Sequence, residues 1–206
     1  MATEDDLRAL GLYHGLMVEA KARALSINAF TNDQRGVPSP FVREYGFLQL
    51  RMLCELIGLG CLVAHGDIEE TKTKAFQKAY DPTEILKRLD ELHPDFYPVP
   101  RQPIKTAKGW HFDNYAGDFL SKADLFTLYG ACGDVLHRGS LKRLVSPKAP
   151  YQKDFTDLGK WGQKVLNLLS NHLITRRGGE FHFITFLDVK DAGGDVQCAI
   201  GELPES

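Results

Sequence analysis

The amino-acid sequence predicts a mainly α protein, a helical bundle of about five to six helices with a small C-terminal β-hairpin. Apolar residues recur at helical spacing over most of the first 176 residues, which is typical of amphipathic and buried helices. From Glu180 to Val189 the side chains alternate instead with the period of a strand. A chain of 206 residues is long enough for one well-packed core. We therefore expect a single helical domain over 1–206, with 180–203 as a β-hairpin appendage.

Capping signals place the first two helices. Thr3 followed by Asp6 has the spacing of an N-cap with an acidic residue at the third helical position, so we expect a helix over 4–30. Ser39-Pro40 supplies an N-cap and a first-turn proline for a second helix, which ends at His65.

This second helix is apolar nearly all round between Phe47 and Ala64. The stretch is barely long enough to span a membrane, and Gln49, Arg51 and Glu55 interrupt it. We therefore interpret it as the buried core helix of a protein that does not enter a membrane.

Further boundary signals divide the rest of the chain. N-cap residues, apolar stripes and glycine or proline stops predict four more helices, over 67–80, 82–92, 121–138 and 154–176. The proline-rich segment 94–120 fits a loop or a small hairpin. The C-terminal hairpin must pack on the helices or pair with another chain, because an isolated hairpin is marginally stable.

Composition and missing motifs exclude several classes of function. A formal net charge of −2 gives no global reason to bind nucleic acid or an acidic membrane. The acidic N-terminus lacks a secretory signal and the four cysteines form no CxxC pair, so we expect a cytoplasmic protein. A Walker A loop, a GxSxG elbow and an HExxH motif are all missing. His111 and Asp113 have ligand-like spacing, but two ligands do not make a metal site, so we expect neither a metal nor another cofactor.

Four polar residues on two helices are candidates for a catalytic site. Arg51 and Glu55 are spaced i, i+4, which permits an ion pair across one helical turn. Asp134 and His137 share a helix face at i, i+3, and a carboxylate beside an imidazole can orient it as a general base. If the two helices pack together, the four could converge. The alternatives are that Arg51 and Glu55 form a structural ion pair and that His137 caps its own helix end.

A basic run follows the helix that carries His137. Arg138, Lys142 and Arg143 are candidates for nucleic-acid binding, because phosphate contacts use such side chains. The alternative is a solvated surface, which the near-neutral charge of the whole chain favours.

Two segments resemble a known family. Leu50–Leu56, reading LRMLCEL, and Leu128–His137, reading LYGACGDVLH, are similar to the layout of HEPN domains, and together with the order of the bundle they cover about a third of the chain. The resemblance implies a helical bundle, often a homodimer, of the kind found in prokaryotic toxins, phage-defence systems and RNA-processing factors. The family's ribonucleases carry an arginine four to six residues before a histidine that His137 matches. Cys132 and Gly133 stand where that arginine would be, so the ribonuclease motif is incomplete.

Three hypotheses for function follow. The first is a HEPN-like module that binds nucleotide, RNA or a protein without the standard ribonuclease motif. The second is a ribonuclease-like cytosolic enzyme that uses Asp134 and His137 as base and Arg51 to hold an anion. The third is a non-catalytic dimerisation or adaptor protein in which polar core residues fix how the helices pack. A homodimer is possible under any of the three.

Overall fold

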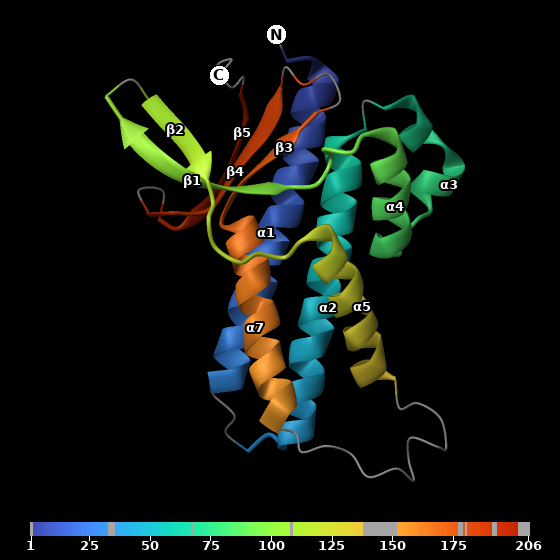
Figure 1. The fold of residues 1–206 in the computed structure, drawn as a ribbon, viewed down its shortest axis with the longest axis vertical. Helices are drawn as coiled ribbons and strands as arrows, with labels where there is room; N and C mark the ends of the chain where they lie inside the picture. The colour runs from blue at the N-terminus through green and yellow to red at the C-terminus, as the bar shows by residue number, and fades with distance from the viewer. Residues whose placement is uncertain are drawn as a thin grey trace.

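A computed structural model describes residues 2–32, 36–66, 68–107, 109–137, 152–176, 179, 181–190 and 193–201. Over these residues the protein is mainly α with a strand region toward the C-terminus (Figure 1). The helices are α1 (Glu4–Asn32), α2 (Ser39–Ala64), the 3-10 turn η1 (Glu69–Lys72), α3 (Lys74–Gln77), α4 (Pro82–Leu92), α5 (Lys122–Leu136) and α7 (Gln152–Leu169).

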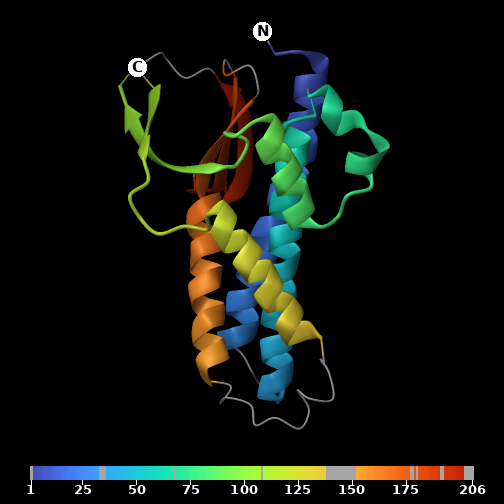
Figure 2. The ribbon, with the colours of Figure 1, turned by 45° about the vertical axis from the view of Figure 1, so that its right-hand side comes forward.

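Helix α2 occupies the centre, with α1, α4, α5 and α7 packed around it (Figures 1 and 2). By length and composition α2 could cross a membrane, but 61% of its most apolar window is buried inside the protein. Three of its glycines admit a neighbour at close range: an added Cβ would lie 2.6 Å from the Leu158 side chain at Gly46, 2.9 Å from Pro82 at Gly58 and 3.0 Å from the Tyr13 ring at Gly60. These glycines let α7, α4 and α1 approach the central helix.

The strands form one antiparallel sheet of order β2-β1-β3-β4-β5 at one end of the bundle (Figure 1). They are β1 (Val99–Thr106), β2 (Gly109–Asn114), β3 (Asn171–Thr175), β4 (His182–Val189) and β5 (Asp195–Gly201). Phe183 on β4 is buried against Tyr13 of α1, with ring centroids 5.8 Å apart. His172 on β3 is also buried, and its Nε2 lies 2.6 Å from the Tyr13 hydroxyl. The sheet therefore shares the helical core.

The sheet corrects the expectation of a small C-terminal hairpin. The hairpin exists as β4 and β5, but β3 and the β1–β2 hairpin extend it to five strands. The helix expected over 154–176 ends at Leu169, and β3 begins at Asn171. Leu173 and Ile174 are both buried, so this strand lacks the alternation of a half-buried one. A short apolar run of this kind cannot be told from a helix by periodicity.

The prediction of one helix over 67–80 is also wrong. The structure has η1 and α3 there, separated by Thr73, whose backbone is extended and whose hydroxyl accepts from the Phe76 N–H. The segment buries Thr71 and Phe76 but has no continuous apolar stripe, so packing does not hold a longer helix together.

Other local predictions are confirmed. Asp81 caps α4, and segment 94–120 contains the hairpin of β1 and β2. Ser121 and Asp124 form a reciprocal capping box at the start of α5. The second helix differs in one detail, because its N-cap is Pro38 and no side chain caps it.

Candidate functional site

The polar site lies at the contact between α2 and α5. Arg51 Nε donates to Glu55 Oε1 at 3.2 Å, and Arg51 Nη2 donates to the Tyr129 hydroxyl at 2.8 Å. The Tyr129 hydroxyl in turn donates to Glu55 Oε1 at 3.4 Å. The guanidinium also lies 4.5 Å from the Tyr129 ring centroid, a cation–π distance. We call these three residues the arginine cluster.

The cluster is partly buried, and this affects its chemistry. The side chains of Arg51 and Glu55 keep 28% and 23% of their surface exposed. Burial, the largest cause, raises the pKa of Tyr129 to about 12 against the opposing effect of Arg51. Tyr129 is therefore a neutral hydrogen-bond donor at physiological pH and not a base. Burial likewise raises the pKa of Cys132 to about 12, so its thiol is not a ready nucleophile.

The structure brings Arg51 and Glu55 together but does not bring His137 to them. His137 is the C-cap of α5, and its backbone N–H donates to the Gly133 carbonyl at 3.0 Å. It lies eight positions beyond Tyr129, about 12 Å along a helix axis, and four positions beyond Gly133, where an added Cβ would be 4.0 Å from Arg51 Nη1. Asp134 lies about 140° around the helix from Tyr129. Both Asp134 and His137 are exposed, and none of the hydrogen bonds within the arginine cluster reaches His137.

The other candidates stand apart from this cluster. Arg138, Lys142 and Arg143 lie outside the described residues. His111 and Asp113 form an exposed ion pair of 3.0 Å on β2. Within the described part of the chain, no group of three or more histidine, cysteine, aspartate or glutamate side chains could hold a metal ion.

Sequence reasoning missed Tyr129 as a member of the site. The residue fitted the apolar stripe of its helix, so the sequence indicated packing. A half-buried tyrosine usually finds a hydrogen-bond partner for its hydroxyl, which was the available signal. The sequence could not say that this partner lies 78 positions away on α2.

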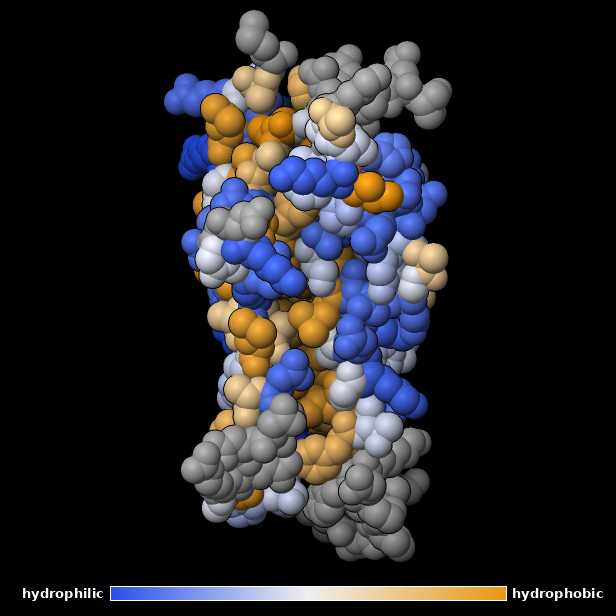
Figure 3. Space-filling model, turned by 90° about the vertical axis from the view of Figure 1, so that its left-hand side faces the viewer, coloured by the Kyte–Doolittle hydropathy of each residue, from blue (hydrophilic) through white to orange (hydrophobic). Residues whose placement is uncertain are grey.

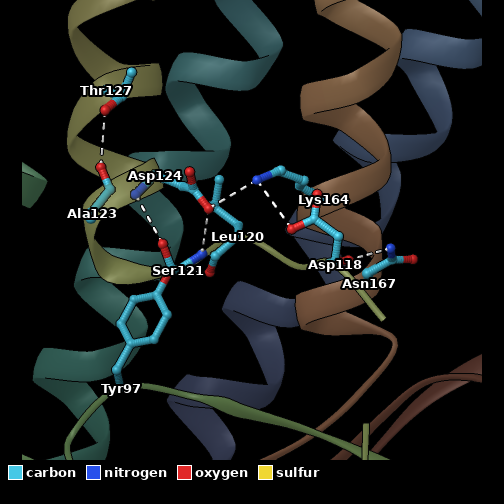
Figure 4. A network of polar contacts seen from close by, with 9 residues as sticks. All are labelled: Tyr97, Asp118, Leu120, Ser121, Ala123, Asp124, Thr127, Lys164 and Asn167. Carbon is cyan, nitrogen blue, oxygen red and sulfur yellow. Dashed lines mark hydrogen bonds and ion pairs between the residues drawn. The ribbon is translucent and has the colours of Figure 1, made fainter. Parts of the chain in front are cut away.

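A second polar network, also missed, joins α7 to the start of α5 (Figure 4). Lys164 Nζ lies 3.1 Å from Asp124 and 3.2 Å from Asp118. The Leu120 N–H donates to the Lys164 carbonyl, and the Tyr97 hydroxyl donates to the Leu120 carbonyl. The hydrogen bond to Asp124 is the largest cause that raises the pKa of Lys164. A lysine held as a cation between two carboxylates serves as a clamp and not as a base or nucleophile.

A groove of about 440 Å³ lies between α1, α2 and α7. In Figure 3, which looks onto the side of α1 and α7, apolar residues form a column in the lower half of the face. None of the lining residues is charged; they are Ala24, Ile27, Asn28, Ser39, Leu53, Phe155, Leu158, Gly159, Gly162, Gln163 and Leu166.

A larger cleft of about 680 Å³ lies beside the first turns of α1 and has charged walls. Arg176, the most buried of its cations, pairs with Asp6 at 2.9 Å and stacks 5.2 Å from the Phe183 ring centroid. Its charge is therefore neutralised within the chain.

The chain matches no protein-family model, no curated protein and no solved structure. The HEPN resemblance accordingly remains a prediction from Leu50–Leu56 and Leu128–His137. Function has to be inferred from the geometry of the molecule itself.

Proposed function

We propose that the protein is a non-catalytic protein-binding module whose groove between α1, α2 and α7 receives an amphipathic helix of a partner protein. The observation that carries this proposal is the groove itself, which has a volume of about 440 Å³ and a lining without charge. Recognition of a helix in a groove uses apolar anchors that recur every three or four residues. Phe155 and Leu166 on α7 supply partly exposed apolar surface, and the buried side chains of Leu158 and Ile27 lie at the base of the groove.

Two glycines on α7 support the proposal. Gly159 and Gly162 line the groove, and nothing lies within 4 Å of the position that a Cβ would take at either residue. Glycine in a helix interior is less stable than alanine by about 1 kcal/mol. The two glycines leave room in the groove for another backbone to come close to α7.

The arginine cluster gives less support to a catalytic function. Arg51 directs its donors at Glu55 and Tyr129, so holding a substrate anion would break contacts within the chain. Among the described residues, no hydrogen bond joins His137 to Arg51 or Glu55, so the imidazole is not held as a base beside the guanidinium. We therefore interpret the cluster as the polar contact that fixes α5 on α2.

The test is a selection of binding peptides from a phage-displayed library of helical peptides. The selected peptides are then titrated against the protein by calorimetry. Replacing both Gly159 and Gly162 by leucine fills the groove, and the change favours the helix because leucine has the higher propensity. The matched control is Gly130→Leu on α5, where the space around the Cβ position is equally open. We expect the groove double variant to weaken peptide binding at least about tenfold, and the control to bind as the wild type does.

Either of two results would reject the proposal. One is a set of selected peptides that bind the filled groove as tightly as the open one. The other is a failure to select any peptide while labelled RNA binds in a salt-dependent manner, which would favour the nucleic-acid hypothesis.

A further inference from the structure

The outer face of α1 is apolar although it is exposed. Seven residues recur there at spacings of three and four, so they lie on one side of the helix, and every one of them is exposed: Leu7, Gly11, Gly15, Val18, Ala22, Leu25 and Ala29. We call them the α1 stripe. The exposed fraction is 59% for Leu7, 46% for Val18 and 55% for Leu25. A solvent-facing helix side normally carries charged and polar residues.

Charge is almost missing from this side. Between Leu7 and Ala29, a span that the structure describes throughout, Arg8 is exposed at the N-terminal end and the other exposed charged residue is Glu19. It lies at the flank of the α1 stripe and pairs with Arg23 at 2.6 Å. The face is therefore closer in character to an interface than to a solvated surface.

The two glycines of the α1 stripe have no explanation within the chain. An added Cβ at Gly11 or Gly15 would meet no atom within 4 Å, whereas Gly46 and Gly60 on α2 each accommodate a neighbouring side chain. Glycine is unfavourable in a helix interior. Two open glycines on an apolar exposed face leave room for another helix to come close at these positions.

We propose that the α1 stripe is the interface between two copies of this chain, with the two α1 helices antiparallel and related by a two-fold axis at Val18. In a two-fold interface, residue i contacts residue j and j contacts i. Seven positions to either side of Val18 stand Gly11 and Leu25, and eleven positions to either side stand Leu7 and Ala29. Leu7 and Leu25 thus each face a small residue of the other copy, in both halves of the interface, and Val18 faces Val18 on the axis. Opposed helix dipoles also favour the antiparallel arrangement.

The available area is sufficient for a specific dimer. From Leu7 to Ala29 the helix is about 33 Å long, and half of its circumference over that length gives about 500 Å² per copy. Two copies would bury about 1,000 Å² in total, the size at which specific interfaces begin. The lining of the groove shares no residue with the α1 stripe, so the two proposals rest on different sides of α1.

The oligomeric state tests the proposal. We expect sedimentation equilibrium to show a dimer for the wild type and a monomer for Val18→Glu and for Leu25→Glu, because a charge on either residue would be buried without a partner. Both positions are exposed in the single chain, so the fold is expected to persist, and circular dichroism checks this. The matched control is Leu48→Glu on α2, an apolar residue that is 42% exposed outside the stripe. A wild type that stays monomeric at its highest soluble concentration, or variants that dimerise as it does, would overturn the proposal.

Cysteine cross-linking tests the antiparallel arrangement. Gly11→Cys and Leu25→Cys proteins, mixed and mildly oxidised, should form a disulfide with one another and not with themselves. A parallel pair would instead link each variant to itself. Cys54, Cys61 and Cys132 are buried, and the partly exposed Cys198 is replaced by serine in both proteins to remove background cross-linking. The groove double variant should dimerise normally, which separates failure of this inference from failure of the proposed function.

Discussion

The buried pair of Tyr13 and His172 should make the protein lose stability in mild acid. His172 is 1% exposed, its Nδ1 lies 3.0 Å from the Leu169 carbonyl, and its Nε2 faces the Tyr13 hydroxyl. A carbonyl only accepts, so Nδ1 carries the proton and Nε2 accepts from the phenol. Burial, the largest cause, lowers the pKa of His172 from 6.5 to about 4.

The direction and size of this change in stability follow from proton linkage. The unfolded chain takes up a proton at His172 below about pH 6.5 while the folded protein stays neutral until about pH 4, so stability falls as the pH drops through this window. Relative to neutral pH the loss reaches about 2 kcal/mol near pH 5. Above about pH 6.5 both states are neutral and His172 adds no pH dependence.

Urea unfolding followed by tryptophan fluorescence measures this effect. His172→Gln removes the titrating group, so its free energy of unfolding should change less between neutral pH and about pH 5, by close to 2 kcal/mol. Tyr13→Phe should keep the acid dependence, because burial and not the phenol lowers the pKa. If wild type and His172→Gln lose equal stability over that range, the reasoning is refuted.

Three further predictions follow from the packing and the polar contacts. Tyr129→Phe keeps the ring beside Arg51 but removes the hydroxyl that links it to Glu55. We expect thermal unfolding to show a loss of about 1 kcal/mol in the free energy of unfolding. An unchanged melting temperature would contradict a stabilising role for the arginine cluster. Gly58→Ala places a Cβ 3.0 Å from the Pro82 backbone, so it should cost about 1–3 kcal/mol. Gly130→Ala, in open space, should instead stabilise by about 1 kcal/mol; equal effects of the two changes in chemical denaturation would refute the packing argument. Mixed RNA should stay intact on a gel with wild type or His137→Ala, and cleavage that disappears in the variant would revive the nuclease hypothesis.

Local signals in the sequence predicted where helices begin. They did not predict contacts between residues that are distant in the chain. The capping box of Ser121 and Asp124 involves neighbours in the chain, so spacing alone reveals it. No local sequence pattern predicts strand β3, because its place between β1 and β4 depends on residues far away in the sequence. The two ladder pairs that join it to β1, Val99 with Leu173 and Pro100 with His172, leave no local pattern.

The candidate site was likewise predictable only where its contacts are local in the sequence. The pairing of Arg51 with Glu55 follows from their spacing on one helix, and it is present. Which side of α5 faces α2 depends on how the two helices pack, so the sequence could not choose between Tyr129 and His137 as the contact of Arg51. In the structure Arg51 contacts Tyr129.

The hydrogen bond between Tyr13 and His172 also has a consequence for synthesis on the ribosome. Its two residues are 159 positions apart, and translation at 5–20 residues per second adds that length in roughly 8–30 s. During this interval α1 has neither its polar partner nor the sheet that covers it. The newly made helix must therefore remain soluble with both its core face and the α1 stripe uncovered. The next segment to emerge, α2, is the earliest part of the chain that can cover the core face.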